Sequence, residues 1–268
     1  MKYSFMSFSC PQLTLGELLA TARRFGYEGV EPRIDRQHKH GVEISASAAQ
    51  CKEIKKQAAG NGITLSCIAT SCAFADPDIT KQNVEHALKC VDLAADVGAG
   101  RIRVFGGSLA KDQKREEAVR IVADALRAVA DHAKGRGVTV CMETHDDWCL
   151  PEDVAAVMRL ANHPAVAVNW DIMHPVRVCK LTMDQAFETL KPWIRHLHIH
   201  DGVPGSAQLV PIGSGGIDHK RAVELLLTIP YEGYLSGEWI NWSDPYEKHL
   251  PRELAIMKSY ERAAAADR

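Results

Sequence analysis

The sequence has no long apolar run, no block of basic residues and no closely paired cysteines. Its apolar runs are too short to span a bilayer, which argues against a membrane-spanning protein. The 32 Lys and Arg residues are balanced by 34 Asp and Glu residues, and this argues against a nucleic-acid or anionic-membrane surface. The eight cysteines form no CxxC pair, so we expect reduced, mostly buried thiols.

A signal-peptide layout is also missing at the start of the sequence. Residues 1–6 enter a strand-like segment at once, and we therefore expect a cytoplasmic protein. The remaining composition, 46% hydrophobic and 25% charged, is ordinary for a globular enzyme. A chain of 268 residues forms one large α/β barrel or two modest domains. No linker or shift in composition marks a boundary, so we expect a single domain over residues 1–268.

Strand-like and helix-like patterns alternate along the whole chain. The expected strands are residues 3–9, 29–31, 63–69, 101–105, 138–142, 166–170, 194–199 and 233–237. The expected helices are residues 15–25, 47–59, 81–97, 115–134, 151–160, 183–190, 217–227 and 253–265. Eight such pairs predict an α/β fold of the single (β/α)8 TIM barrel type. A doubly wound open sheet is the alternative, but the GxGxxG motif that often follows its first strand is absent here.

Acidic and imidazole side chains come at the ends of four successive strands. In a (β/α)8 barrel the active site lies at the carboxyl ends of the strands. The last four expected strands end at or beside Glu143, Asp171, His198 and Glu238. Three carboxylates with one imidazole suit Mn²⁺, Mg²⁺ or Co²⁺ better than a structural zinc site. We expect one divalent metal ion, Mn²⁺ ahead of Mg²⁺, Co²⁺ or Zn²⁺; the alternative is four unconnected polar residues.

Five further polar residues near strand ends are candidates for binding substrate. His145 and His200 each share a strand face with an expected ligand, and His174 follows Asp171 by three residues. Glu31 ends the second expected strand, and Arg103 lies near the end of the fourth. Arg103 would bind a carboxylate or phosphate, or else only pair with Glu31; for the other four the alternative to substrate contact is packing or support of a neighbouring side chain.

Six motifs in the order typical of one superfamily cover nearly the whole chain. They are Gly26-Tyr27-Glu28-Gly29-Val30-Glu31, Glu143-Thr144-His145, Asp171-Ile172-Met173-His174, His196-Leu197-His198-Ile199-His200-Asp201, Pro211-Ile212-Gly213-Ser214-Gly215-Gly216-Ile217-Asp218 and Gly237-Glu238-Trp239. With them the chain resembles the sugar isomerase/epimerase superfamily with the xylose isomerase-like barrel.

That resemblance implies an enzyme that moves a proton beside the carbonyl of a small sugar or sugar derivative. It implies Glu143, Asp171, His198 and Glu238 as metal ligands and His174 as a substrate contact. It also implies that Glu143 and Glu238 act as the acid and base. Whether the chain forms a homo-oligomer stays open.

Three other functions are weighed against this one. Ketose 3-epimerases of the superfamily carry an acidic residue and an arginine where this chain has Cys149 and Pro204. Residues 198–218 look more like inosose dehydratases, so a dehydratase is the main alternative. An endonuclease IV-type enzyme needs extra histidines at the ends of the third and fourth strands, which this chain lacks. A non-enzymatic sugar-binding barrel would not need four metal ligands.

A glycine-rich loop precedes the seventh expected helix. Gly213, Gly215 and Gly216 predict either a phosphate cradle of backbone N–H groups or a tight turn into the helix, with Asp218 as its cap. The loop contains no basic residue, so we favour the turn.

Overall fold

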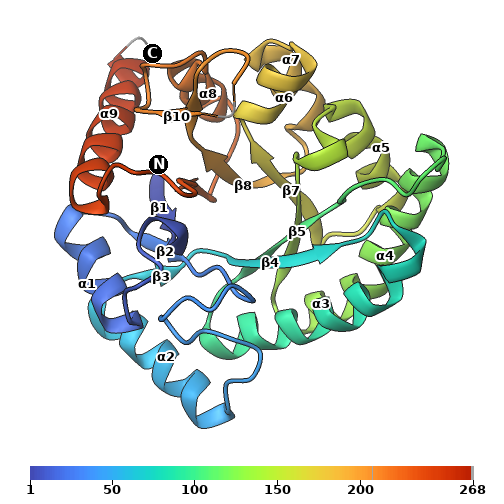
Figure 1. Ribbon diagram of the computed structural model, residues 1–268, viewed down its shortest axis with the longest axis horizontal. Helices are drawn as coiled ribbons and strands as arrows, with labels where there is room; N and C mark the ends of the chain where they lie inside the picture. The colour runs from blue at the N-terminus through green and yellow to red at the C-terminus, as the bar shows by residue number, and fades with distance from the viewer. Residues whose placement is uncertain (207, 267–268) are drawn as a thin grey trace.

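Parallel strands form a ring that is enclosed by helices, as Figure 1 shows along the barrel axis. The computed structural model describes residues 1–206 and 208–266. Nine strands are hydrogen-bonded in the order β3-β2-β1-β11-β8-β7-β6-β5-β4. Their bounds are β1 (Lys2–Met6), β2 (Gly29–Glu31), β3 (Thr64–Leu65), β4 (Ile68–Ala73), β5 (Arg101–Phe105), β6 (Thr139–Glu143), β7 (Val166–Asp171), β8 (Ile194–Ile199) and β11 (Tyr234–Gly237). The fold is a single α/β TIM barrel, as predicted.

The barrel has eight strand positions because β3 and β4 share one of them. The sequence predicts a single strand over residues 63–69, but Ser66 and Cys67 interrupt it. β3 pairs with β2, whereas β4 pairs with β5. A parallel bridge between Arg33 and Ala69 then joins the two sides. The interruption lets the segment pair with β2 through its first half and with β5 through its second half, which closes the ring.

The helices cover the outside of the ring (Figure 1). They are α1 (Leu15–Phe25), α2 (Ala48–Asn61), α3 (Pro77–Val97), α4 (Arg115–Gly135), α5 (Pro151–Ala161), α6 (Met173–Cys179), α7 (Met183–Leu190), α8 (His219–Leu226) and α9 (Tyr246–Ala266). Short elements complete the chain: the 3-10 turns η1 (Ser7–Ser9) and η2 (Asp146–Trp148), and a hairpin of β9 (Asp201–Gly202) with β10 (Leu209–Val210). Among the described residues, no helix is long and apolar enough to cross a membrane.

Local sequence signals explain most helix ends. Thr14 and Glu17 form a capping box at the start of α1, and Gly26 ends the helix in the left-handed conformation. α3 begins four residues earlier than expected because Asp76 caps it and Pro77 occupies its first position. α6 is not expected from the sequence at all, and it places His174 on a helix rather than in a loop.

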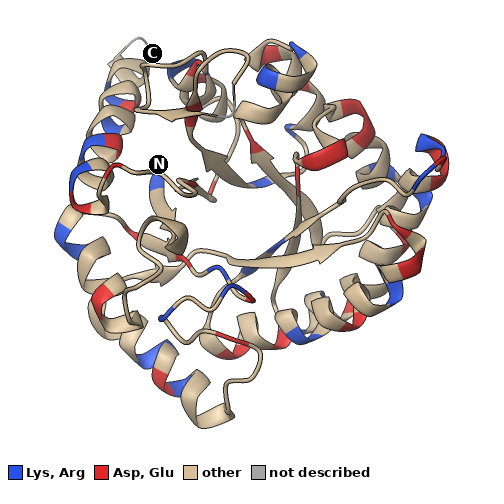
Figure 2. Ribbon diagram, viewed as in Figure 1, with Lys and Arg blue, Asp and Glu red and all other residues tan. Residues whose placement is uncertain are grey.

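Charged side chains lie mainly on the outer helices. In Figure 2, Lys and Arg alternate with Asp and Glu along these helices rather than forming a face of one sign. The interior of the ring contrasts with this surface, because β7 is buried over all six of its residues. Buried charged residues are concentrated at the carboxyl ends of the strands, where the candidate site is built.

Candidate metal centre and active site

The four expected metal ligands meet at the carboxyl end of the barrel. Glu143 ends β6, Asp171 ends β7, His198 lies in β8 and Glu238 follows β11 directly. One donor atom from each lies within 4.8 Å of the others, and all four residues are buried. The distance from His198 Nδ1 is 2.7 Å to Glu143 Oε1 and 3.4 Å to Glu238 Oε2. The strand-end pattern thus identifies residues that the fold brings into one cluster.

The electrostatics of this cluster suit a bound cation. Burial alone would raise the pKa of Glu238, but His198 together with His200 and Arg103 outweighs it, and the pKa falls to about 2. Burial would likewise lower the pKa of His198, but Glu143, Glu31 and Glu238 raise it well above its ordinary value. Three buried carboxylates therefore depend on a positive charge among them. A divalent ion bound by the oxygen-rich set would supply that charge, so the residues fit the expected metal.

Glu31 lies behind the cluster and fixes the orientation of His198. Its carboxylate is 2.8 Å from His196 Nε2 and 3.1 Å from His198 Nε2. With Nε2 of His198 engaged there, Nδ1 faces Glu143 and Glu238. A carboxylate behind a metal-binding histidine holds the ring and its tautomer in the same way. The exposed fraction of Glu31 is 0%, so its position favours support of His198 over contact with substrate.

Arg103 also lies behind the ligands. Its Nε is 3.2 Å from Glu143 Oε2, and its Nη1 donates to Thr70 O at 2.9 Å. The guanidinium stacks 3.9 Å from the ring centre of Phe105. The sequence left Arg103 between binding an anion and pairing with Glu31, and the structure pairs it with Glu143 instead. This pair holds the carboxylate oxygen of Glu143 that does not contact His198.

Asp171 joins the metal cluster to the histidines of the pocket. His200 Nε2 is 2.8 Å from Asp171 Oδ2, and His174 Nε2 is 3.7 Å from the same oxygen. Burial would raise the pKa of Asp171, but these two imidazoles hold it well below its ordinary value. The other oxygen accepts the N–H groups of Met173 and His174 at the start of α6. Helix α6 therefore fixes the carboxylate and carries His174 with it.

A small pocket of about 170 Å³ opens beside Glu238. Its lining includes the three histidines expected to bind substrate, His145, His174 and His200. Burial would lower the pKa of His145, but the hydrogen bond to Asp146 and the charge of Glu143 raise it to about 9. The pocket therefore offers hydrogen-bond donors and positive charge next to the metal cluster. Glu31 and Arg103 are not among its lining residues.

Arg177 lines the same pocket, although the sequence alone did not indicate it as a site residue. It follows His174 by three residues, so on α6 the two side chains are neighbours, and Arg177 Nη2 is 3.4 Å from His174 Nδ1. Its Nη1 donates to Ser206 O at 3.1 Å, while its Nε is buried without a hydrogen-bond partner among the described residues. The sequence would have indicated this pair only if a helix had been expected from residue 173, because the three-residue spacing then places the two side chains together.

The glycine-rich loop is filled by a carboxylate of the protein itself. Asp201 accepts the backbone N–H groups of Gly202, Gly213, Gly215 and Ile217 at 2.9 to 3.1 Å. A Cβ atom on Gly215 would lie only 2.2 Å from Asp201 Oδ1, which explains the glycine. Asp201 occupies the centre of the would-be phosphate cradle, and Asp218 caps α8 by accepting Arg221 N. Both observations favour a tight turn into α8 over a phosphate-binding loop.

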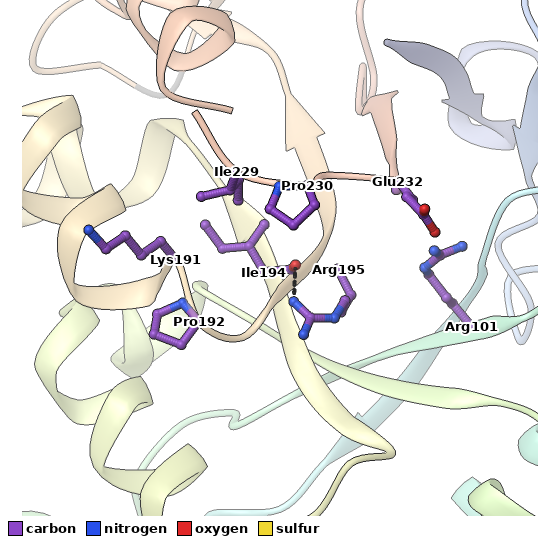
Figure 3. Close-up of a pocket in the computed structure, with 9 residues that line it drawn as sticks. Arg101, Lys191, Pro192, Ile194, Arg195, Ile229, Pro230 and Glu232 are labelled. Atoms are coloured by element: carbon purple, nitrogen blue, oxygen red, sulfur yellow. Dashed lines mark hydrogen bonds between the residues drawn. The ribbon is translucent and has the colours of Figure 1, made fainter. Parts of the chain in front are cut away.

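A larger pocket lies at the opposite end of the barrel (Figure 3). Its volume is about 510 Å³, and its lining includes Ile194 at the start of β8 and Arg101 at the start of β5. Figure 3 shows Arg195 bent back onto the carbonyl oxygen of Ile194, to which it donates at 2.8 Å. The amino ends of the strands are far from the metal cluster and serve stability in barrels of this type. Size alone therefore does not identify the active site.

Comparison with known proteins places the chain in a family. Residues 19–260 match the model of the xylose isomerase-like TIM barrel, and the chain belongs to that family. The L-ribulose-5-phosphate 3-epimerase of Salmonella typhi is 26% identical over 263 residues, which cover 93% of this chain and 89% of that protein.

Two solved structures share the fold. An L-ribulose 3-epimerase has a TM-score of 0.82, with 18% identity over 100% of this chain and 97% of its own. The probable 3-DHS dehydratase of Bacillus anthracis has a TM-score of 0.80, with 18% identity over 96% of this chain and 99% of its own. An epimerase and a probable dehydratase thus share this barrel, and the fold alone does not separate the two reactions.

Proposed function

We propose that the protein is a divalent-metal-dependent epimerase or isomerase of a small sugar or sugar derivative. The convergence of four buried donors beside a pocket lined by histidines carries this proposal. The epimerase names of the relative in Salmonella typhi and of one structural neighbour support it. Mn²⁺ is the first candidate for the metal because the donor set is mostly carboxylate.

Glu143, Asp171, His198 and Glu238 would hold the ion. When bound, the ion would polarise the substrate carbonyl and stabilise the negative charge that develops on its oxygen. Glu238 is the one carboxylate of this set that also lines the pocket, so we assign it the proton transfer on the side that faces substrate. Glu143 comes from another strand across His198, and we assign it the second transfer. The His145, His174 and Arg177 side chains would orient the substrate oxygens.

A dehydratase is the second candidate. Elimination starts with the same proton transfer and then needs an acid for the departing hydroxyl. His200 and His174 stand beside Asp171 at the pocket and are placed for that step. Cys149, which replaces the second acidic residue of ketose 3-epimerases, is buried and directs its thiol to Asp146 O. This position therefore provides no carboxylate that would favour epimerisation over dehydration.

Metal content and proton exchange test the proposal together. Purified protein is expected to bind about one Mn²⁺ per chain, and His198→Ala is expected to lose it. Ketoses, ketose phosphates and inososes are then incubated in D₂O and followed by NMR. Deuterium next to the carbonyl with a new stereoisomer supports the epimerase, and a deoxy product supports the dehydratase.

Glu238→Gln tests the assigned residue against a matched control. It is expected to lower turnover by at least a hundredfold while the metal is retained. Glu232→Gln, which alters an exposed glutamate at the opposite end of the barrel, is expected to leave turnover unchanged. Normal turnover by Glu238→Gln would remove Glu238 from the mechanism. Absence of bound metal, even with added Mn²⁺, would contradict the proposed function itself.

A further inference from the structure

Two cysteines and a histidine form a second cluster away from the candidate active site. Cys72 lies in β4, and His86 and Cys90 lie one turn apart on α3, which packs on the outside of β4 (Figure 1). One sulfur or nitrogen atom from each lies within 4.8 Å of the others. Both cysteines are fully buried, and the cluster shares no residue with the four expected metal ligands.

We propose that Cys72, His86 and Cys90 bind a thiophilic divalent cation, Zn²⁺ in the first instance. Thiolate and imidazole are the ligands that zinc favours, whereas the active-site cluster is built of carboxylates. A tetrahedral zinc ion holds such donor atoms roughly 3.5 to 3.8 Å apart, given Zn–S and Zn–N lengths of about 2.3 and 2.0 Å. Donors already within 4.8 Å therefore reach this geometry by shifts of about 1 Å or less.

Neighbouring groups provide what a zinc-binding histidine requires. Asp35, in the loop after β2, lies 2.9 Å from His86 Nε2 and holds the ring, so Nδ1 would be the nitrogen that binds the ion. Glu43 accepts the N–H of Asp35, and its other oxygen is buried without a hydrogen-bond partner among the described residues. The side chain of His86 is 28% exposed, so solvent reaches the proposed site at its histidine.

The two thiols differ in how readily they lose a proton, because the hydrogen bond to Cys72 and burial raise the pKa of Cys90 well above its ordinary value. The hydrogen bond from Cys90 outweighs the effect of burial and, with help from Thr70 and His86, lowers the pKa of Cys72 to about 7. Binding of Zn²⁺ releases the protons of Cys72 and Cys90 and leaves two thiolates and a neutral imidazole on the ion. The bound ion would join α3 to β4 and, through His86 and Asp35, to the loop over the barrel mouth.

Cobalt binding tests the site, because absorption from thiolate-to-cobalt charge transfer requires a cysteine ligand. Metal-free, reduced full-length protein is titrated with Co²⁺ and then with Zn²⁺. We expect a charge-transfer band that accounts for about one thiolate-bound Co²⁺ per chain, apart from any Co²⁺ held by the carboxylate cluster, and that disappears when Zn²⁺ displaces it. Zn²⁺ in hundredfold excess over its Kd is also expected to raise Tm by roughly 5 °C.

Matched variants identify the ligands. Cys90→Ser is expected to abolish the band, and His86→Ala, whose side chain is partly exposed, is expected to weaken cobalt binding at least tenfold. Cys141→Ser removes another buried cysteine, and His132→Ala removes a histidine that pairs with Asp92 as His86 pairs with Asp35. Both controls should bind cobalt normally. No band in the reduced wild type, a band that survives Cys90→Ser, or equal weakening in His132→Ala would overturn the proposal.

Discussion

Removal of the Asp201 carboxylate should destabilise the protein far more than removal of another aspartate in the same loop. Asp201 accepts four backbone N–H groups, and two of them, from Gly202 and Ile217, belong to buried residues. The donors of Gly213 and Gly215 are nearer the surface, where water can replace the carboxylate. Asp201→Ala thus leaves two buried donors without a partner.

The expected loss follows from those two donors. A hydrogen bond to a charged group contributes about 1.5 to 3 kcal/mol, so two of them give a loss of about 4 kcal/mol in the free energy of unfolding. That is a large share of the 5 to 15 kcal/mol typical of a folded domain. Asp218→Ala removes one exposed cap bond, from Arg221 N, and should cost about 1 kcal/mol.

Urea denaturation followed by circular dichroism measures both variants against the wild type. The midpoint of Asp201→Ala should fall several times further than that of Asp218→Ala. Asp201→Asn should lose less than Asp201→Ala, because its one oxygen can take the Oδ1 position, which accepts both buried donors, while its NH₂ group faces the donors of Gly213 and Gly215 nearer the surface. If Asp201→Ala lost no more than Asp218→Ala, the carboxylate would not organise the loop, and the phosphate-cradle interpretation would return.

Three further predictions concern the metal ligands, the pocket and acid stability. Glu31→Gln should weaken Mn²⁺ binding by 10- to 100-fold in calorimetry, because His198 loses the carboxylate that orients it; a Kd within twofold of wild type would contradict this role. Arg177→Gln should raise KM at least tenfold with unchanged metal content, and more for a sugar phosphate than for the free sugar; an unchanged KM would exclude substrate contact. Burial lowers the pKa of His40 to about 4, so its unfolded form takes up a proton below pH 6.5 while the folded form stays neutral. The protein should therefore lose about 2 kcal/mol of stability from His40 between pH 7.5 and 5. His40→Asn, which keeps an acceptor for Val42 N, should lack this part of the pH dependence in urea denaturation; an identical slope would refute the assignment.

The barrel and the convergence of the four expected ligands were predictable because both follow from short-range periodicity. Alternating strand and helix patterns suffice to predict eight strand positions, and the strand-end rule selects Glu143, Asp171, His198 and Glu238. The interruption at Ser66 and Cys67 was not predictable, since it depends on which neighbour each half of the segment meets. Pairing across a sheet is a long-range property that local pattern does not contain.

The side chains around the cluster were harder to predict for the same reason. Glu31 and His198 are 167 residues apart, and only closure of the barrel shows that the carboxylate reaches the ring. Arg177 was missed because α6 is short and contains Pro175, which hides its helical spacing. The burial that makes Arg103 a partner of Glu143 is equally a result of tertiary packing.

The arrangement of charge around Glu143 and Glu238 explains how two similar carboxylates would act differently. Arg103 and His198 hold Glu143 from two sides, and its exposed fraction is 0%. Glu238 contacts His198 at the longer distance of 3.4 Å and lines the pocket. Both carboxylates are assigned a proton transfer, but the more tightly held Glu143 contributes more to holding the ion, whereas Glu238 is freer to follow a proton on the substrate. The asymmetry therefore predicts that Glu143→Gln loses metal and turnover together, whereas Glu238→Gln loses turnover first. Measured metal content of the two variants distinguishes these outcomes, and equal metal loss in both would show that the two carboxylates share one role.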